Sequence, residues 1–125
     1  MKFDLTEEHL MIRDAARDFA QNELLPGVID RDENQIFPSD QVKKMSELGF
    51  MGMMVPEKWG GSGMDTFSFV LAIEEIASVE LATSTIMSVN NSLVCQVLDD
   101  WGTDFQKNKY LKDLSRGMKL GAYSL

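Results

Sequence analysis

The chain has 125 residues, of which 44% are hydrophobic, and its formal net charge at pH 7 is -8. This length suits one domain with a real hydrophobic core, while the acidic balance argues against binding to nucleic acid or to an anionic membrane. The single cysteine and single histidine exclude an internal disulfide and are too few for an ordinary zinc site. We therefore expect no metal site.

The N-terminal segment, residues 1–8, carries acidic residues where a signal or transit peptide has basic ones. No apolar run in the sequence approaches the length that a membrane-spanning helix needs. We therefore expect a cytoplasmic protein with an untargeted N-terminus and no membrane insertion.

The first part of the chain is predicted to be helical. Thr6 is a good N-cap for a helix from about residue 7 to residue 25, because apolar side chains repeat there at helical spacing. A polar connection is expected at residues 30–37. Ser39 is then expected to cap a short helix that stops at Gly49, since glycine readily takes the left-handed conformation that ends helices.

Residues 49–65 are rich in glycine and contain a proline, which predicts a structured loop. The run Gly60–Gly63 invites comparison with a phosphate-binding loop. However, it follows Trp59 rather than a clear strand, and it lacks the lysine of that motif. The favoured interpretation is a tight turn that places Val55, Pro56 and Trp59 against the helices.

The middle of the chain predicts three more helices. Asp65 or Thr66 opens an amphipathic helix that reaches Ala77. Residues 81–98 are nearly all apolar or small, but Asn90-Asn91-Ser92 interrupts them. Short polar side chains can close one helix and cap the next, so this segment predicts two consecutive buried helices.

Thr103 is predicted to cap a last helix, which ends at residues 115–117. The apolar side of this helix is expected to consist of Phe105, Tyr110, Leu111 and Leu114. The chain then enters an apolar, strand-like segment at residues 120–125. This pattern predicts a helical domain over residues 1–119 and, over residues 120–125, the first strand of a truncated middle β-domain.

No catalytic constellation is visible in these residues. Glu74 and Glu75 are adjacent on a helix and point about 100° apart, so they are poorly placed to act as an acid and base pair. His9 lies among acids in a first helical turn and is interpreted as a surface residue, whereas Cys95 lies in an apolar run and is interpreted as inert packing. A basic run can contact a phosphorylated ligand but is more often a solvated face: Lys107, Lys109, Lys112, Arg116 and Lys119.

Several motifs occur in the order and spacing of one protein family. They are Arg13–Ala20, Leu48–Gly52, Val55–Asp65, Glu74–Ala77, Ser88–Leu93 and the ending Trp101–Leu125. Together they resemble the N-terminal helical domain of the acyl-CoA dehydrogenases, most closely the short-chain, butyryl-CoA type. The resemblance implies an all-α fold, a bundle of about five or six helices, that stops where the family's middle β-domain begins.

The resemblance implies an FAD-dependent enzyme that dehydrogenates short-chain acyl-CoA to trans-2-enoyl-CoA. The family's catalytic glutamate and most FAD contacts would lie beyond residue 125, so this chain alone is expected to contain no catalytic residue and to be inactive. Tyr123 and Leu125 match the first positions of the family's flavin-contacting strand. Val89, Asn90 and Leu93 match the helix break that floors the acyl pocket, where their volume should influence chain length, and simple packing between helices is the alternative.

The resemblance also implies partners. Electron-transferring flavoprotein is expected to insert an apolar anchor into a pocket of this domain, with Phe19, Met53 and Ile73 as candidate lining residues. The full-length protein is expected to be a homotetramer. Two alternatives stay open: an acyl-CoA oxidase, which differs mainly in oxygen access to the reduced flavin, and a non-catalytic helical binding module that lost the flavin domains.

Overall fold

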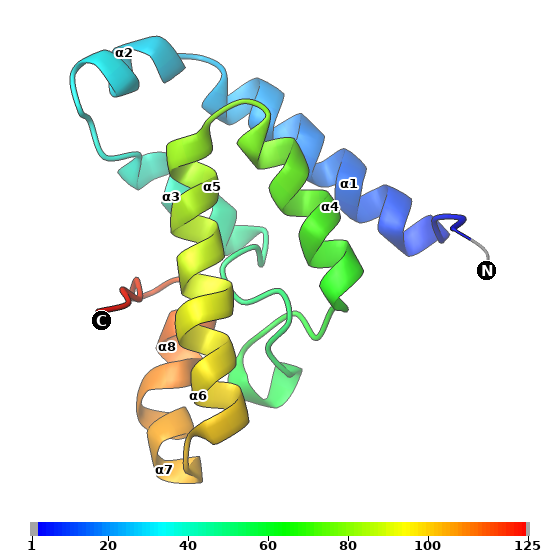
Figure 1. Ribbon diagram of the computed structural model, residues 1–125, viewed down its shortest axis with the longest axis vertical. Helices are drawn as coiled ribbons and strands as arrows, with labels where there is room; N and C mark the ends of the chain where they lie inside the picture. The colour runs from blue at the N-terminus through cyan, green and yellow to red at the C-terminus, as the bar shows by residue number, and fades with distance from the viewer. Residues whose placement is uncertain (1–2, 125) are drawn as a thin grey trace.

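The computed structural model describes residues 3–124, and every regular element within that range is helical (Figure 1). The α-helices are α1 (Glu7–Phe19), α2 (Val28–Glu33), α3 (Ser39–Glu47), α4 (Thr66–Ala77), α5 (Leu81–Ser88), α6 (Gln96–Trp101), α7 (Asp104–Gln106) and α8 (Lys112–Ser115). π-Helical turns extend α1, join α5 to α6 and join α7 to α8: Ala20–Leu24, Val89–Cys95 and Lys107–Leu111. The expected all-α bundle is confirmed.

Helix α1 lies alongside α4 because both helices carry an apolar face (Figure 1). The buried side chains of these faces belong to one core cluster: Ile12, Ala16 and Phe19 on α1, and Phe69, Ala72 and Ile76 on α4. Steps of three and four residues place each set on one side of its helix. The helix predicted from residue 7 to about residue 25 is confirmed, with its π-helical end at Leu24.

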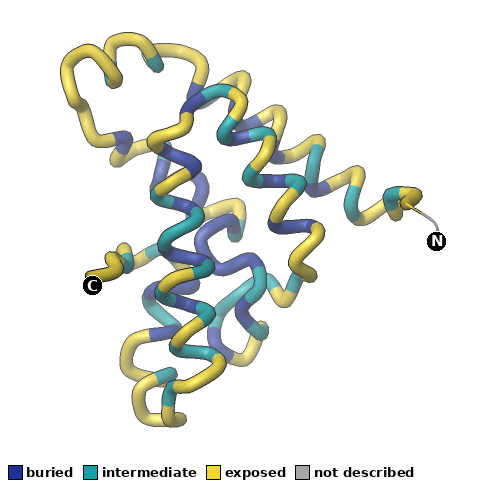
Figure 2. The backbone as a smooth tube through the Cα atoms, viewed as in Figure 1, coloured by how far each residue is buried: buried dark blue, intermediate teal, exposed yellow. Residues whose placement is uncertain are grey.

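The core consists of two clusters of buried apolar side chains. Figure 2 shows buried residues in dark blue, many of them at the centre of the molecule. The larger cluster joins α1, α3, α4 and α5 to the loop after α3. Its fully buried methionines are Met45, Met51, Met53 and Met87. Flexible thioethers fit the irregular space where a loop meets helices, so packing is the role of these side chains. The smaller cluster consists of Val55, Trp59, Cys95, Leu111 and Leu114.

Helix α2 occupies part of the segment that was predicted as a polar connection over residues 30–37. The helix runs from Val28 to Glu33 and has no buried apolar residue. The prediction was wrong because the segment has no apolar stripe, which is the pattern that reveals a helix in a sequence. Ser39 also differs from expectation: Pro38 takes the N-cap position of α3, and Ser39 is its first residue.

A buried ion pair ties α2 to the bundle. The Arg31 Nε donates a hydrogen bond of 2.9 Å to a carboxylate oxygen of Glu80, and the two side chains are only 10% and 7% exposed. The Arg31 guanidinium also donates to the carbonyls of Leu24 and Pro26, and the Thr83 hydroxyl donates to Glu80. One cluster of polar groups therefore connects the end of α1, the helix α2 and the start of α5.

The glycine-rich segment forms the predicted tight turn. Val55 and Trp59 are buried, and backbone hydrogen bonds of 2.8–2.9 Å join residues 62–64 to residues 52–55. A Cβ atom on Gly61 would lie 2.0 Å from the carbonyl oxygen of Val55, so the backbone is closely packed at this glycine. The segment thus acts as a packed connection between the two core clusters.

Asp65 caps the N-terminus of α4 and Thr66 is the first helical residue, which decides between the two starting residues that the sequence offers. Its carboxylate accepts a hydrogen bond of 2.7 Å from the Ser68 backbone amide and contacts His9 Nε2 at 3.1 Å. These two interactions, the Ser68 amide first, lower the pKa of Asp65 from 3.8 to about 2. The charged carboxylate is therefore the form that stabilises the folded helix.

We expect the Asp65→Asn variant to lose less stability on acidification than the wild type. Because folding lowers the pKa of Asp65, its contribution is complete above pH 3.8 and is lost as the pH falls towards 2. Asparagine is an equally good N-cap but lacks the charge, so the variant should be about 0.3–1 kcal/mol less stable at pH 6. Urea unfolding at pH 6 and pH 2.5 measures this difference, and a difference that stays constant between these pH values would contradict the expectation.

The long helix from α5 to α6 has no break at residues 90–92. The prediction of two consecutive helices was wrong, because Asn90 and Asn91 are buried in the π-helical turn and bond to other segments instead of capping helix ends. Thr103 does cap α7 as predicted. Leu111 and Leu114 are buried as expected. Phe105 and Tyr110 are exposed, which corrects the predicted apolar side.

The chain leaves the bundle through residues 120–124, which form neither helix nor strand. A strand needs a neighbouring strand to complete its hydrogen bonds, so the strand over residues 120–125 and the division at residue 119 stay predictions. Leu125 lies outside the described residues. Within residues 3–124, no helix has the length and apolar character that would carry it across a membrane.

Candidate functional site

The predicted site residues lie at the π-helical turn Val89–Cys95 and in the C-terminal segment. Val89 is half-buried, Leu93 is 43% exposed, and Asn90 has no exposed surface. Tyr123 is 55% exposed. Of the three predicted residues in this turn, the apolar Val89 and Leu93 are therefore partly exposed, whereas the polar Asn90 points inwards.

The side chain of Asn90 connects three segments of the chain. Its Nδ2 donates hydrogen bonds of 2.8 Å to the Met51 carbonyl and 3.0 Å to the Leu114 carbonyl. Its Oδ1 accepts a hydrogen bond of 2.8 Å from the Gly121 backbone amide. The loop after α3, the end of α8 and the C-terminal segment therefore meet at one buried carboxamide.

Asn91 has a similar role on the neighbouring side of the helix. Its Nδ2 donates to the carbonyls of Phe50 and Met87 at 2.8 and 2.9 Å, and its Oδ1 accepts from the Met53 amide at 2.8 Å. Sequence reasoning interpreted this residue as a helix cap and missed its structural role. The signal was present in two adjacent carboxamides within an apolar segment, because buried amides need partners.

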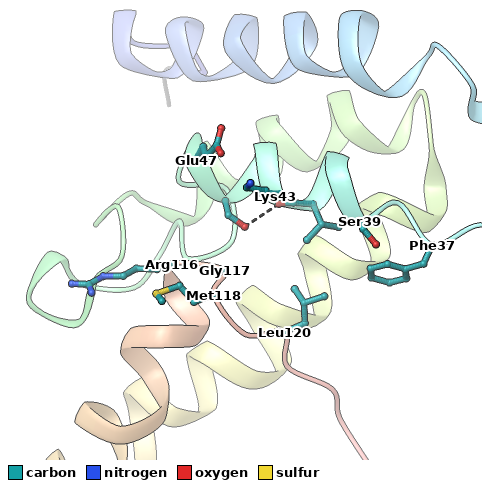
Figure 3. A pocket seen from close by; sticks show the side chains of 10 residues that line it. Phe37, Ser39, Lys43, Glu47, Arg116, Gly117, Met118 and Leu120 are labelled. Atoms are coloured by element: carbon teal, nitrogen blue, oxygen red, sulfur yellow. Dashed lines mark hydrogen bonds between the residues drawn. The ribbon is translucent and has the colours of Figure 1, made fainter.

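A groove of about 470 Å³ lies between α3 and the residues that follow α8 (Figure 3). Its lining includes the apolar side chains of Phe37, Met118 and Leu120 and the charged side chains of Lys43, Glu47 and Arg116. The groove lies beside the start of the C-terminal segment, because its lining residue Leu120 is three residues before Tyr123.

The other candidate groups have structural partners. Cys95 is buried, and desolvation raises the pKa of its thiol to about 12, so it is not a reactive thiolate at neutral pH. In the basic run, Lys107 lies 3.7 Å from Asp99, and Lys119 lies 2.9 Å from Asp113. Among the described residues, no group of three or more His, Cys, Asp or Glu side chains is placed to hold a metal ion.

Comparison with known proteins places this arrangement in a family. Residues 6–118 match the family model for the acyl-CoA dehydrogenase N-terminal domain. The chain belongs to the acyl-CoA dehydrogenase family. The resemblance that the motifs indicate is therefore confirmed, and the described helices form the family's N-terminal helical domain.

The acyl-CoA dehydrogenase relatives include enzymes specific for short chains. The chain is 41% identical over 125 residues to the short-chain specific acyl-CoA dehydrogenase of Clostridium acetobutylicum and 43% identical over 122 residues to the mitochondrial short-chain enzyme of Bos taurus. These alignments cover 100% and 98% of this chain but only 33% and 30% of the relatives. The chain thus spans about a third of the length of the curated relatives that it matches.

Solved acyl-CoA dehydrogenase structures share the fold. Butyryl-CoA dehydrogenase from Megasphaera elsdenii matches with a TM-score of 0.91 and 34% identity, over 96% of this chain and 32% of that chain. A chain from the solved structure of the electron transferring flavoprotein of Acidaminococcus fermentans matches with a TM-score of 0.92 and 40% identity, again over 96% of this chain and 32% of that chain.

A second groove on this acyl-CoA dehydrogenase domain bears on the predicted partner pocket. It has a volume of about 530 Å³ and lies between α1 and α3, with Phe19 and Leu48 among its lining residues. Of the three residues predicted to line a partner pocket, Phe19 contributes to this groove. Met53 is fully buried in the core, and Ile73 packs partly buried against that core.

Proposed function

We propose that this chain is the N-terminal domain, residues 1–119, and the first strand of the middle domain of an acyl-CoA dehydrogenase. The complete enzyme would convert short-chain acyl-CoA to trans-2-enoyl-CoA. The observation that carries this proposal is the 41% identity over all 125 residues to a short-chain specific enzyme. The alignment extends beyond the helical domain through the C-terminal segment, which favours a catalytic protein over a stand-alone helical binding module.

The contribution of this chain would be to shape the acyl pocket. Val89 and Leu93 lie one helical turn apart, so both can contact the same part of a short acyl chain. The bulk of these side chains would limit the length of the acyl chain. Among the described residues, Glu80 is the buried carboxylate, and it is paired with Arg31. The catalytic base is therefore proposed to lie beyond residue 125.

The C-terminal segment fits a role at the edge of an FAD site. Tyr123 is exposed, and among the described residues no group accepts a hydrogen bond from the amides of residues 122–124. These free donors and an exposed aromatic ring suit a flat, polar cofactor. FAD, when bound, supplies the hydride acceptor for the dehydrogenation. Tyr123 and Leu125 would hold and orient it from this side.

The electron acceptor of the complete enzyme is proposed to be an electron-transferring flavoprotein. The match to a chain in the structure of such a flavoprotein from Acidaminococcus fermentans supports this choice. The groove beside Phe19 offers an apolar surface on a domain with net charge -8, which suits a transient contact. A homotetramer in the cytoplasm is proposed for the complete protein.

The test uses the full-length protein that contains this chain. We expect the purified protein to carry a yellow flavin and to lose its visible absorption when butyryl-CoA is added without oxygen. A long-chain acyl-CoA serves as the control and should react more slowly. Bound flavin without bleaching by butyryl-CoA would contradict the substrate, and absence of flavin would support the binding-module alternative. Rapid oxygen consumption after reduction would identify an oxidase instead.

A further inference from the structure

The buried carboxamide of Asn90 has more than a packing role. We propose that Asn90 is a positioning residue that sets where the flavin-contacting segment begins, through its hydrogen bond to the Gly121 amide. The inference rests on the proposed function, because it concerns the geometry between the acyl-pocket helix and the flavin segment. Asn90 itself has no exposed surface, so its effect on the acyl pocket and on the flavin segment would be indirect, through the segments that it holds.

The orientation of the Asn90 carboxamide is determined by its partners. Both strong contacts of Nδ2 are carbonyl oxygens, those of Met51 and Leu114, and the contact of Oδ1 is an N–H group. A flipped carboxamide would place oxygen against two carbonyls and its NH₂ group against the Gly121 amide, so only one orientation satisfies all three. The side chain is also fully buried, which removes water as a substitute partner.

Gly121 is held by a second, independent restraint. A Cβ atom at this position would lie 2.7 Å from three side-chain atoms of Val94 in the same π-helical turn. The backbone of the C-terminal segment therefore passes directly against that turn, where only glycine fits without movement. The hydrogen bond to Asn90 and the close contact with Val94 together fix both the direction and the distance of the segment.

Gly121 is the last described residue whose amide is bonded to the helical domain. Tyr123 follows two residues later, so its backbone lies within about 7 Å of the bonded Gly121 along the chain. The same turn carries Val89 and Leu93 on its outer side. Loss of the hydrogen bond between Asn90 and Gly121 would thus move the flavin segment relative to the residues proposed to contact the acyl chain. Small misplacements of reacting groups can lower the reaction rate about a hundredfold.

The test compares Asn90→Ala with Asn91→Ala in the full-length protein. Both changes remove a buried carboxamide that holds the loop after α3, but only Asn90 contacts Gly121. We expect similar losses of thermal stability in the two variants. We expect Asn90→Ala to weaken flavin binding and slow anaerobic reduction by saturating butyryl-CoA about tenfold to a hundredfold, while Asn91→Ala keeps both within about twofold.

A second pair of variants changes the close contact between Gly121 and Val94 instead of the hydrogen bond. Gly121→Ala should displace the segment and reproduce the flavin defect, and adding Val94→Ala should restore flavin binding because it removes the crowding atoms. If Asn90→Ala does not fold, this pair still tests whether the position of Gly121 controls flavin binding. Equal flavin properties in the Asn90 and Asn91 variants, or no rescue by Val94→Ala, would overturn the inference. A wild-type protein without flavin would instead overturn the proposed function and, with it, this inference.

Discussion

Replacing Glu80 with alanine should lower the free energy of unfolding by about 3–5 kcal/mol, because it leaves the Arg31 guanidinium buried without its counter-charge. Arg31 is only 10% exposed and cannot turn to solvent without giving up its bonds to the Leu24 and Pro26 carbonyls. The loss should be measured by urea unfolding at pH 7. Helix α2 has no buried apolar residue, so without this ion pair we expect it to become the first segment to lose protection in hydrogen exchange.

The matched control for this pair is Glu23→Ala. Glu23 pairs with Lys44 at the surface, where the two side chains are 38% and 49% exposed, so its loss should cost less than about 1 kcal/mol. The double variant Arg31→Met, Glu80→Leu should be more stable than Glu80→Ala, because it leaves no unpaired charge inside the protein. Equal destabilisation by Glu80→Ala and Glu23→Ala would contradict the assignment of a buried, coupled pair.

The Gly61→Ala variant should be destabilised by about 3 kcal/mol or more, the upper part of the range for overpacking. Its new methyl group would lie 2.0 Å from the Val55 carbonyl oxygen and 2.4 Å from the Val55 Cβ. Backbone atoms of a packed turn cannot move aside as a flexible side chain can. The connection between the two core clusters would therefore have to shift as a unit, and thermal unfolding followed by circular dichroism would report the loss.

Gly63→Ala separates steric overlap from backbone strain in the same turn. Gly63 has φ of +63°, but a methyl group there would meet only the Glu57 Cγ at 3.5 Å. The cost should be about 1 kcal/mol, which is the penalty of a left-handed conformation in a residue with a side chain. If Gly61→Ala were no worse than Gly63→Ala, close packing against Val55 would not be the reason for the glycine.

Local patterns predicted the elements whose cause is local. The helix from residue 7 to about residue 25 was correct because its apolar residues repeat at helical spacing, and the Asp65 and Thr103 caps were correct because capping involves neighbouring residues. Helix α2 was missed because the contact that holds it joins Arg31 to Glu80, 49 residues away. No window of sequence contains both members of that pair.

The error at residues 90–92 has the same origin. Asparagine and serine favour helix ends when their side chains bond to nearby backbone, and that local tendency predicted a break. In the folded chain, the carboxamides of Asn90 and Asn91 bond mainly to distant backbone groups. Five of their six backbone partners lie 24 to 41 residues away, and the Met87 carbonyl is the one within the same helix. These distant partners allow the helix to continue through a π-helical turn.

The amino-acid sequence alone determined the helical class, the positions of most helices and the membership of the acyl-CoA dehydrogenase family. Periodicity, capping residues and ordered motifs are properties of residues that are close in the sequence, so they can be recognised without knowing the fold. The tertiary structure decided which polar side chains are buried and what they hold. Asn90, Asn91 and the Arg31–Glu80 pair have their roles because burial removes water, and each must then find its partner in a segment that only folding brings near.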